Sequence, residues 1–365
     1  MENPSVVLYG PLKADVEDRP IPAIDEVNDV IIRIAYVGVC GSDVHFWNHG
    51  GVRWKATEPL VMGHEASGIV HAVGPGVTSL VPGDRVTLEP GIPCRKCRDC
   101  KAGHYNRCPR MVFAASPPYH GTLTRYYPTS ADFCYKIPDS MSLEEATLIE
   151  PLAVGVHAVR LAAVQPGNKV VVFGAGTVGL FCAAVARDFG ASVVLSVDIL
   201  ESKLSFAKEF IGPNVGRTAT PDLSLPPEKN ARQLIEMHDL GDGADVVIDA
   251  SGAESSVNTG IYVLRPGGVY VQVGMGKRKI EFPIAEVCER EISLKGSFRY
   301  GAGDFEMAVG LVKRGTIILK SLVSNIFSFK EAPEAWKATG LGVGIKNLIQ
   351  GPGIVLDHKA SEQND

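Results

Sequence analysis

One stretch constrains the fold of this chain more than any other: KVVVFGAGTVGL, residues 169–180. It opens with a short, continuous apolar run, as expected for a strand that is buried on both faces. Three glycines follow in the pattern G-x-G-x-x-G, and apolar residues then recur at helical spacing. The helical positions are Val178, Phe181, Cys182 and Val185. The stretch therefore predicts a strand, a tight turn and a helix in immediate succession.

Further short apolar runs continue this pattern along the chain. They are SVVLSVD (192–198), ADVVIDASG (244–252), GGVYVQVG (267–274) and ISLKGSF (292–298). Strands that alternate with helices indicate a doubly wound parallel sheet. We therefore predict an α/β domain of the Rossmann type in the second half of the chain.

The glycine turn in such a unit is typical of a dinucleotide site. Gly174 permits the tight turn, Gly176 lets the backbone approach a pyrophosphate, and Gly179 lets helix and strand pack closely. The helix N-terminus then faces the phosphates with its free N–H groups. The alternative is a tight strand–helix turn with an ordinary helix N-terminus.

A carboxylate at the end of the next strand selects between the two nicotinamide cofactors. Asp198 can accept hydrogen bonds from the 2′- and 3′-hydroxyls of a ribose, and it would repel a 2′-phosphate. NAD is therefore favoured over NADP. The predicted cofactor-binding residues are Gly174, Gly176, Thr177, Val178, Gly179, Asp198, Lys203, Val273 and Gly274.

The first 150 residues have a different pattern, rich in glycine, proline and short apolar runs. Examples are DVIIRIAYVGV (29–39), SGIVHAVG (67–74) and GDRVTL (83–88). Short strands with turn residues between them predict a β-rich, barrel-like domain.

Four cysteines are concentrated in IPCRKCRDCKAGHYNRC, residues 92–108. They are Cys94, Cys97, Cys100 and Cys108. Four thiolates in one short loop can surround Zn²⁺ as a tetrahedron, and such a site leaves no position for water or substrate. The loop is therefore predicted to be a structural zinc site. An iron–sulfur cluster is the alternative, because Cys108 precedes a proline, but the last spacing is longer than in ferredoxins.

Composition and charge narrow the function classes. The 365 residues are 45% hydrophobic and 21% charged and have a net charge of −5, which argues against a general nucleic-acid binder. No apolar run approaches the ~18 residues of a membrane span. The start, MENPSVVLYG, lacks the features of a secretory signal, so we expect a cytoplasmic protein. In that reducing compartment, clustered cysteines favour metal over disulfides.

A second set of metal-binding residues lies in GVCGSDVHFW (38–47) and VMGHEASG (61–68). Cys40, His64 and Glu65 offer sulfur, nitrogen and oxygen donors, a set that suits a zinc with an open coordination position. Neighbouring strand residues point to opposite faces, so the backbone must turn near Gly63 for His64 and Glu65 to share a metal. From the residues alone, a single cysteine near the end of a strand is more often a core residue than a ligand, and a simple hydrogen-bonded pair is the alternative for His64 and Glu65.

Several motifs together resemble a known family. They are CGSDVHFW, GHEASG, the four-cysteine loop, LIEPLAVGVHA (148–158), VVFGAGTVG and GSFRYG (296–301). In this order they resemble the polyol dehydrogenase branch of the zinc-dependent medium-chain dehydrogenases, from about residue 28 to residue 350. The resemblance implies a GroES-like catalytic domain (1–154 and 300–365, with the zinc lobe at 92–110) and an inserted Rossmann domain (155–299).

The resemblance also implies roles for individual residues. Cys40, His64 and Glu65 would be the catalytic zinc ligands, and Glu150 would either ligate the metal or orient a water bound to it. Ser42 and His45 are candidates for a proton relay, since histidine titrates near neutral pH. Arg299 and Tyr300 would hold polyol hydroxyls, and Phe46 and Phe113 would form an apolar wall.

The implied activity is the reversible oxidation of xylitol to D-xylulose with NAD, in a protein with two zinc ions per chain. L-Arabinitol and sorbitol are alternative substrates, because they differ from xylitol by only one stereocentre or one carbon. A homodimer or homotetramer is expected. Two alternatives belong to other classes: a non-catalytic NAD-binding sensor or structural protein, and an interaction module in which the basic cysteine loop binds RNA or a protein.

Overall fold

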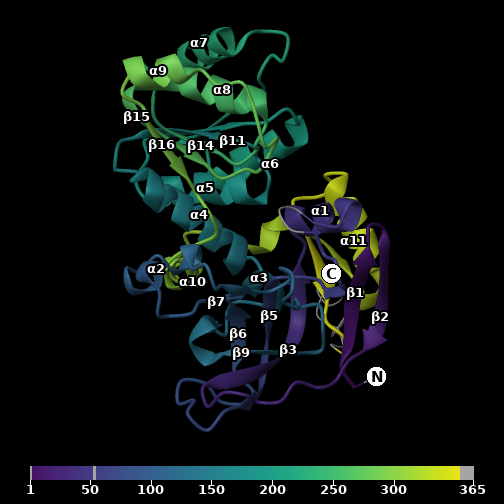
Figure 1. Cartoon of the computed structure of the whole chain (residues 1–365). Coiled ribbons are helices and arrows are strands. Elements are labelled where there is room, and N and C mark those ends of the chain that lie inside the picture. The colour runs from purple at the N-terminus through teal and green to yellow at the C-terminus, as the bar shows by residue number, and fades with distance from the viewer. Residues whose placement is uncertain (1, 52–54, 354–365) are drawn as a thin grey trace, which may run out of the picture. The chain divides into compact units, whose positions relative to one another are not determined.

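The structure is a computed structural model, and it describes residues 2–51 and 55–353 (Figure 1). By their packing, the residues form two compact units. The first takes its described residues from Met1–Cys94, Pro109–Glu150 and Leu319–Asp365, and the second takes its residues from Arg95–Cys108 and Pro151–Ile318. We call them the β-rich unit and the α/β unit. Residues 354–365, which the sequence assigned to the catalytic domain, lie outside the described ranges.

The β-rich unit is built from short strands and few helices. Its strands are β1 (Pro4–Gly10), β2 (Lys13–Asp18), β3 (Asp29–Gly38), β4 (Leu60–Val61), β5 (Glu65–Val73), β6 (Arg85–Leu88), β7 (Gly91–Ile92), β8 (Val112–Phe113), β9 (Tyr126–Ser130), β10 (Cys134–Lys136), β17 (Val323–Phe327) and β18 (Lys346–Gln350). Its helices are α1 (Gly41–His49), α3 (Leu143–Ala146) and α11 (Ala332–Gly340), with 3₁₀ turns at Ala131–Phe133, Lys320–Leu322 and Phe329–Glu331. The strands expected at 29–39, 67–74 and 83–88 are confirmed as β3, β5 and β6.

The main sheet of this unit has the order β10-β6-β5-β3-β18-β17, and β9 also pairs with β3. Strand β18 pairs antiparallel with β3, so the C-terminal segment completes the sheet that the N-terminal segment begins. The core of this unit is apolar. Within it, α1 packs against α11 through Trp47 and Trp336, whose ring centroids are 5.3 Å apart.

The α/β unit alternates strands and helices along the chain. Its strands are β11 (Lys169–Phe173), β12 (Val193–Val197), β13 (Gly216–Ala219), β14 (Ala244–Asp249), β15 (Leu264–Gln272) and β16 (Ser293–Gly296). Its helices are α2 (Arg98–Lys101), α4 (Ile149–Ala162, which begins in the β-rich unit), α5 (Thr177–Asp188), α6 (Glu201–Ile211), α7 (Pro227–Met237), α8 (Glu254–Val263), α9 (Ile284–Glu289) and α10 (Asp304–Lys313), with a 3₁₀ turn, η1, at Tyr105–Arg107.

These strands form one parallel sheet in the order β13-β12-β11-β14-β15-β16. Helices α4 and α5 lie on one side of it and α7 to α9 on the other (Figure 1). The strand order reverses at β11, so the carboxyl ends of β11 and β14 flank the crevice in which doubly wound sheets bind ligands. The predicted fold class, a β-rich domain with an inserted Rossmann sheet, is confirmed.

Within the described ranges, no helix combines the length and the hydropathy that a membrane span requires.

Candidate metal centres and cofactor site

Three residues of the β-rich unit gather into one group of metal-binding atoms. The donor atoms of Cys40, His64 and Glu65 all lie within 4.8 Å of one another. Cys40 immediately precedes α1, and Glu65 begins β5, where it pairs with the end of β3. Between β4 and β5 the backbone turns at Gly63, whose φ is +89°. The expected turn before His64 is therefore present, and it brings two neighbouring side chains to one point.

This donor set fits a zinc ion. It offers one thiol sulfur, one imidazole nitrogen and one carboxylate oxygen, which are the three ligand types that zinc accepts. His64 is 8% exposed and Glu65 is 1% exposed, so two ionisable side chains are buried together. A buried carboxylate requires a compensating positive charge, which a metal ion can supply. Three protein ligands leave a fourth position open, which is typical of catalytic zinc sites.

Asp43 supports this group from the first turn of α1, a role that the sequence reasoning missed. Its buried carboxylate accepts a hydrogen bond from the backbone N–H of Cys40 at 2.9 Å and lies 3.7 Å from His64 Nδ1. Burial alone would lower the pKa of His64, but the Asp43 carboxylate and the Cys40 thiol outweigh it and raise that pKa to about 10. A metal that binds His64 must therefore displace a proton. The available sequence signal was an acidic residue three positions after a helix N-cap.

Lys346, the first residue of β18, is the second residue that sequence reasoning missed. Its side chain is 3% exposed, forms an ion pair with Glu65 Oε2 and donates a hydrogen bond to the carbonyl of Val39 at 3.0 Å. Burial alone would lower the pKa of Lys346, but the Glu65 carboxylate raises it above its usual value. A positive charge thus faces the carboxylate of the metal-binding group inside the core.

Glu150 and Phe113 also lie near this group. Glu150 is 5% exposed, and its carboxylate helps to raise the pKa values of His64 and Lys346. Among the described residues, however, it is not part of the set whose donor atoms lie within 4.8 Å. The ring centroid of Phe113 is 6.0 Å from that of His64. An acidic side chain and an aromatic ring therefore lie near the candidate metal site.

Helix α1 carries the other three predicted residues of this unit. Ser42 and His45 are three positions apart and so share one face of the helix. Ser42 is half-buried and His45 is exposed, so this face extends from the interior to the solvent. Phe46 is buried in the hydrophobic core of the unit.

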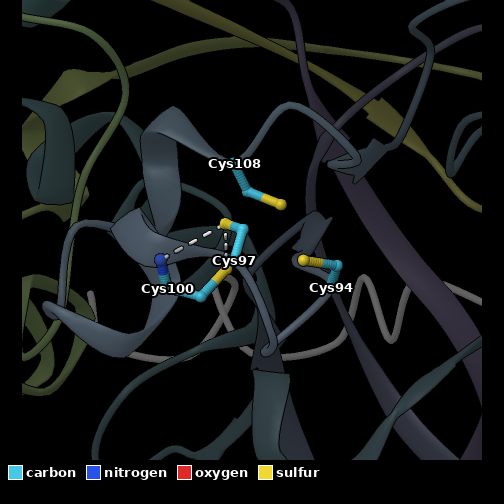
Figure 2. Close-up of side chains that lie close together, drawn as sticks. All are labelled: Cys94, Cys97, Cys100 and Cys108. Carbon is cyan, nitrogen blue, oxygen red and sulfur yellow. Dashed lines mark hydrogen bonds between the residues drawn. The ribbon is translucent and has the colours of Figure 1, made fainter.

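The four cysteines of residues 94–108 also lie together. Their sulfur atoms are within 4.8 Å of one another, and those of Cys97 and Cys100 are 3.4 Å apart. Figure 2 shows the four thiols gathered around one point. Tetrahedral Zn–S bonds of about 2.3 Å place sulfur atoms a little under 4 Å apart, so this group fits a closed zinc site. Arg110 Nη2 donates to Cys94 Sγ at 3.2 Å and adds a positive charge beside the thiols.

We expect Cys97→Ser to lower the melting temperature by about 10 °C. Loss of one ligand from a closed metal site costs about 4 kcal/mol, and 1 kcal/mol corresponds to about 2–4 °C in a unit of this size. Thermal unfolding and the zinc content of the purified variant measure the effect. Cys288→Ser is the matched control, because Cys288 is exposed and outside the cluster. Equal melting temperatures for the two variants would contradict a structural metal.

The glycine turn of the α/β unit has the geometry that a dinucleotide requires. Gly174 follows β11 with a φ of +91°, and a Cβ on Gly179 would overlap the carbonyl oxygen of Gly174. Gly176 is the N-cap of α5 and has no side chain to cap it; a Cβ there would meet nothing within 4 Å. Thr177 and Val178 form the first turn of the helix. The turn thus offers open space and a helix N-terminus at the place where a pyrophosphate would bind.

Asp198 lies at the end of β12, beside this turn. Its carboxylate accepts hydrogen bonds from the backbone N–H groups of Ala175 at 2.7 Å and Leu200 at 3.0 Å. These bonds hold it next to the glycine turn, as a ribose ligand requires. Lys203 lies in the first turn of α6.

A second loop at the carboxyl ends of the strands completes this edge of the sheet. Asp249, at the end of β14, is fully buried, and its carbonyl accepts hydrogen bonds from Val273 and Gly274, both at 2.8 Å. A Cβ on Gly174 would lie 3.0 Å from the backbone nitrogen of Ser251, so the loops after β11 and β14 are close neighbours. The sequence analysis placed residues 249–252 at the end of a predicted strand run (244–252) and did not name them as cofactor-binding residues. In the structure β14 ends at Asp249, and the loop begins there.

We expect Asp198→Ala to weaken NAD binding by about 10–100-fold, since hydrogen bonds to a charged group contribute ~1.5–3 kcal/mol. Binding of NADP should weaken much less, because the repulsive carboxylate is removed as well. Quenching of protein fluorescence by each dinucleotide measures both constants. Asp242→Ala, an exposed carboxylate of the same unit, should leave them unchanged. An unchanged NAD/NADP ratio in Asp198→Ala would contradict the ribose role.

The two remaining predicted residues, Arg299 and Tyr300, lie between β16 and α10 in the α/β unit. The guanidinium of Arg299 is 4.7 Å from the ring centroid of Phe298. The ring of Tyr300 is buried edge-on against Phe305, with centroids 4.9 Å apart.

Comparison with known proteins agrees with these observations. The family model for the alcohol dehydrogenase GroES-like domain matches residues 26–139, and the zinc-binding dehydrogenase model matches residues 177–314.

Relatives extend the match over nearly the whole chain. A probable D-xylulose reductase A of Aspergillus clavatus is 53% identical and another, of Emericella nidulans, is 54% identical; each alignment covers 96% of this chain and 97% of the relative. The crystal structure of L-idonate 5-dehydrogenase from Escherichia coli superimposes with a TM-score of 0.86 at 30% identity, covering 95% of this chain and 98% of that one. The chain therefore belongs to the zinc-dependent medium-chain dehydrogenase family, as its sequence motifs indicate.

Proposed function

We propose that this protein is an NAD-linked zinc polyol dehydrogenase that interconverts xylitol and D-xylulose. The observation that carries the proposal is the Cys40–His64–Glu65 group, with His64 and Glu65 buried and Cys40 half-buried, in a chain more than 50% identical to proteins named D-xylulose reductase. NAD supplies the hydride acceptor, and Zn²⁺ supplies a Lewis acid that lowers the pKa of an alcohol. The protein contributes binding, orientation and proton transfer.

Residues around the metal group hold its donors in place. Asp43 anchors the backbone at Cys40 and faces His64, and Lys346 orients Glu65. Such supporting partners typically contribute 10–100-fold to metal affinity or activity. Glu150 stands close by, and in this proposal it orients a water or the substrate hydroxyl. Phe113 limits the access of water beside His64.

A proton must leave the site when an alcohol is oxidised. In this proposal, Ser42 receives it from the substrate side and His45 passes it to solvent. Their shared face of α1 and the exposure of His45 support this route. An imidazole is suited to the step because its pKa lies near neutrality.

The α/β unit holds the cofactor. The first turn of α5 binds the pyrophosphate, Asp198 and Lys203 approach the ribose, and Val273 and Gly274 lie along the same strand edge. Arg299 and Tyr300 are proposed to contact polyol hydroxyls, and Phe46 is proposed as part of the apolar wall. The assignment of residues 1–154 and 300–365 to catalysis and of 155–299 to NAD belongs to the same proposal.

Two further expectations accompany it: one structural zinc in the cysteine loop, and a homodimer or homotetramer in the cytoplasm. The reducing conditions there keep the four thiols available for metal.

The experiment is the initial rate of NADH formation with xylitol, L-arabinitol and D-sorbitol, repeated with NADP. We expect xylitol with NAD to be fastest, by a factor of about 10–200, since a pocket discriminates such analogues by ~1–3 kcal/mol. A faster rate with L-arabinitol or sorbitol would overturn only the choice of polyol. No rate with any of them, in protein that contains two zinc ions per chain, would overturn the proposal.

A further inference from the structure

Besides its cysteine cluster, the four-cysteine loop makes hydrogen bonds to the backbone of another segment of the α/β unit. Asn106 Nδ2 donates a hydrogen bond to the carbonyl of Phe298 at 2.9 Å, and the hydroxyl of Tyr105 donates to the carbonyl of Gly301 at 3.2 Å. Asn106 is 8% exposed. We call Phe298–Gly301 the arginine turn. Side chains of the loop thus hold both of its ends.

The arginine turn has a backbone conformation that needs such support. Arg299 has a φ of +57°, in the left-handed region that residues with a Cβ rarely adopt. A conformation of this kind persists only where the surrounding structure imposes it, and it is found preferentially at functional sites. The contacts on either side of residue 299 therefore hold its backbone in this conformation, which an arginine does not prefer by itself.

A third contact fixes the C-terminal end of the turn. The buried carboxylate of Asp304 accepts a hydrogen bond from the backbone N–H of Gly301 at 2.7 Å. His157 Nδ1 is 2.8 Å from the same carboxylate, and Arg160 forms an ion pair with it. These partners belong to α4 and α10. The bonds from Tyr105 and Asn106 connect the turn to the cysteine loop.

Tyr105 and Asn106 lie in the chain between two of the clustered cysteines. Both belong to η1, which lies in the chain between Cys100 and Cys108. A metal held by these two thiolates fixes the chain at both ends of η1, and the ion pair between Arg107 and Asp99 at 3.1 Å adds a link within the loop. Ligation in the loop is thereby transmitted, through two hydrogen bonds, to the arginine turn.

We propose that the four-cysteine loop is a positioning element for polyol recognition, and that Tyr105 and Asn106 are positioning residues that hold Arg299 in place for the substrate hydroxyls. This inference rests on the proposed function, in which Arg299 contacts the polyol. Tyr105 and Asn106 act through the backbone of the turn and take no part in hydride or proton transfer. Loss of the loop metal then weakens recognition of the polyol as well as stability.

The test uses the full-length, zinc-loaded enzyme with the double substitution Tyr105→Phe and Asn106→Asp. The first removes only a hydroxyl, and the second replaces the donor amide with an acceptor of the same shape. We expect KM for xylitol to rise about tenfold, from the loss of two hydrogen bonds, with kcat and KM for NAD nearly unchanged. In an Arg299→Ala background, the same double substitution should change KM for xylitol less than about twofold, because coupled positions are not additive.

Asn230→Asp provides the matched control. Asn230 is 6% exposed, lies in the same unit and donates to the carbonyl of Asp222 at 2.7 Å, so its substitution makes the same chemical change elsewhere. It should lower stability without raising KM for xylitol. Hydrogen–deuterium exchange gives a readout independent of activity: the amides of residues 297–304 should exchange faster in Tyr105→Phe/Asn106→Asp and in Cys97→Ser, but not in Asn230→Asp.

The outcomes separate the two proposals. Suppose that Arg299→Ala raises KM for xylitol. If the double substitution then leaves KM for xylitol unchanged, or raises it by the same factor with and without Arg299, the positioning inference is overturned and the proposed function stands. If Arg299→Ala leaves KM for xylitol unchanged, Arg299 does not bind the polyol. Both the inference and that part of the proposed function are then overturned.

Discussion

Replacing His64 with alanine should lower kcat/KM for polyol oxidation to about 10⁻³ of its original value. The imidazole is one of three donors that lie within 4.8 Å of one another in the core, and a zinc held by the other two would bind weakly. The Lewis-acid contribution that is lost amounts to several kcal/mol, and each 1.36 kcal/mol changes the rate tenfold. Steady-state rates with xylitol and NAD, together with the zinc content per chain, measure the effect.

The control for this experiment is His71→Ala. His71 lies on β5, the strand that follows His64, but it is exposed, and its ring is tilted against that of Tyr126. We expect His71→Ala to retain two zinc ions and nearly full activity, and His64→Ala to retain only the zinc of the cysteine loop. An active His64→Ala enzyme, or one that still contains two zinc ions, would show that the Cys40–His64–Glu65 group is not the catalytic centre.

Replacing Lys346 with methionine should destabilise the zinc-free protein by about 3–5 kcal/mol, the usual effect of removing one partner from a buried ion pair. Glu65 would then be left in the core without a compensating charge, or would have to take up a proton, and both states are unfavourable. Zinc supplies a positive charge to the same carboxylate. The loss should therefore be clearly smaller in the zinc-loaded protein.

Urea unfolding of the zinc-free and zinc-loaded forms tests this difference. Lys330→Met is the matched control, because Lys330 is exposed in the same unit and its replacement should change stability by less than about 0.5 kcal/mol. If Lys346→Met loses the same free energy with and without zinc, Lys346 contributes by packing alone and does not balance the charge of Glu65.

The local features of this protein were determined by its sequence alone. The cysteine loop and the glycine turn each place their functional groups within a short segment, so spacing defines the chemistry before the chain is folded. The Rossmann sheet could also be predicted from local sequence, because strands that are buried on both faces consist of continuous apolar runs. The predicted strands at 169–174 and 192–198 correspond closely to β11 and β12.

The surroundings of the metal group were decided only by the tertiary structure. Cys40 and His64 approach because β3 pairs with β5 and the chain turns at Gly63, and Lys346 reaches Glu65 because β18 pairs with β3. A lysine at the start of a C-terminal strand is ordinarily exposed, and no local pattern marks it as the partner of a buried carboxylate. Strand register and burial are properties of the whole sheet, so distant residues acquire their partners only when the sheet forms. The hold of the cysteine loop on the arginine turn has the same origin: spacing predicts that the loop can bind a metal, and the fold determines which backbone that loop supports.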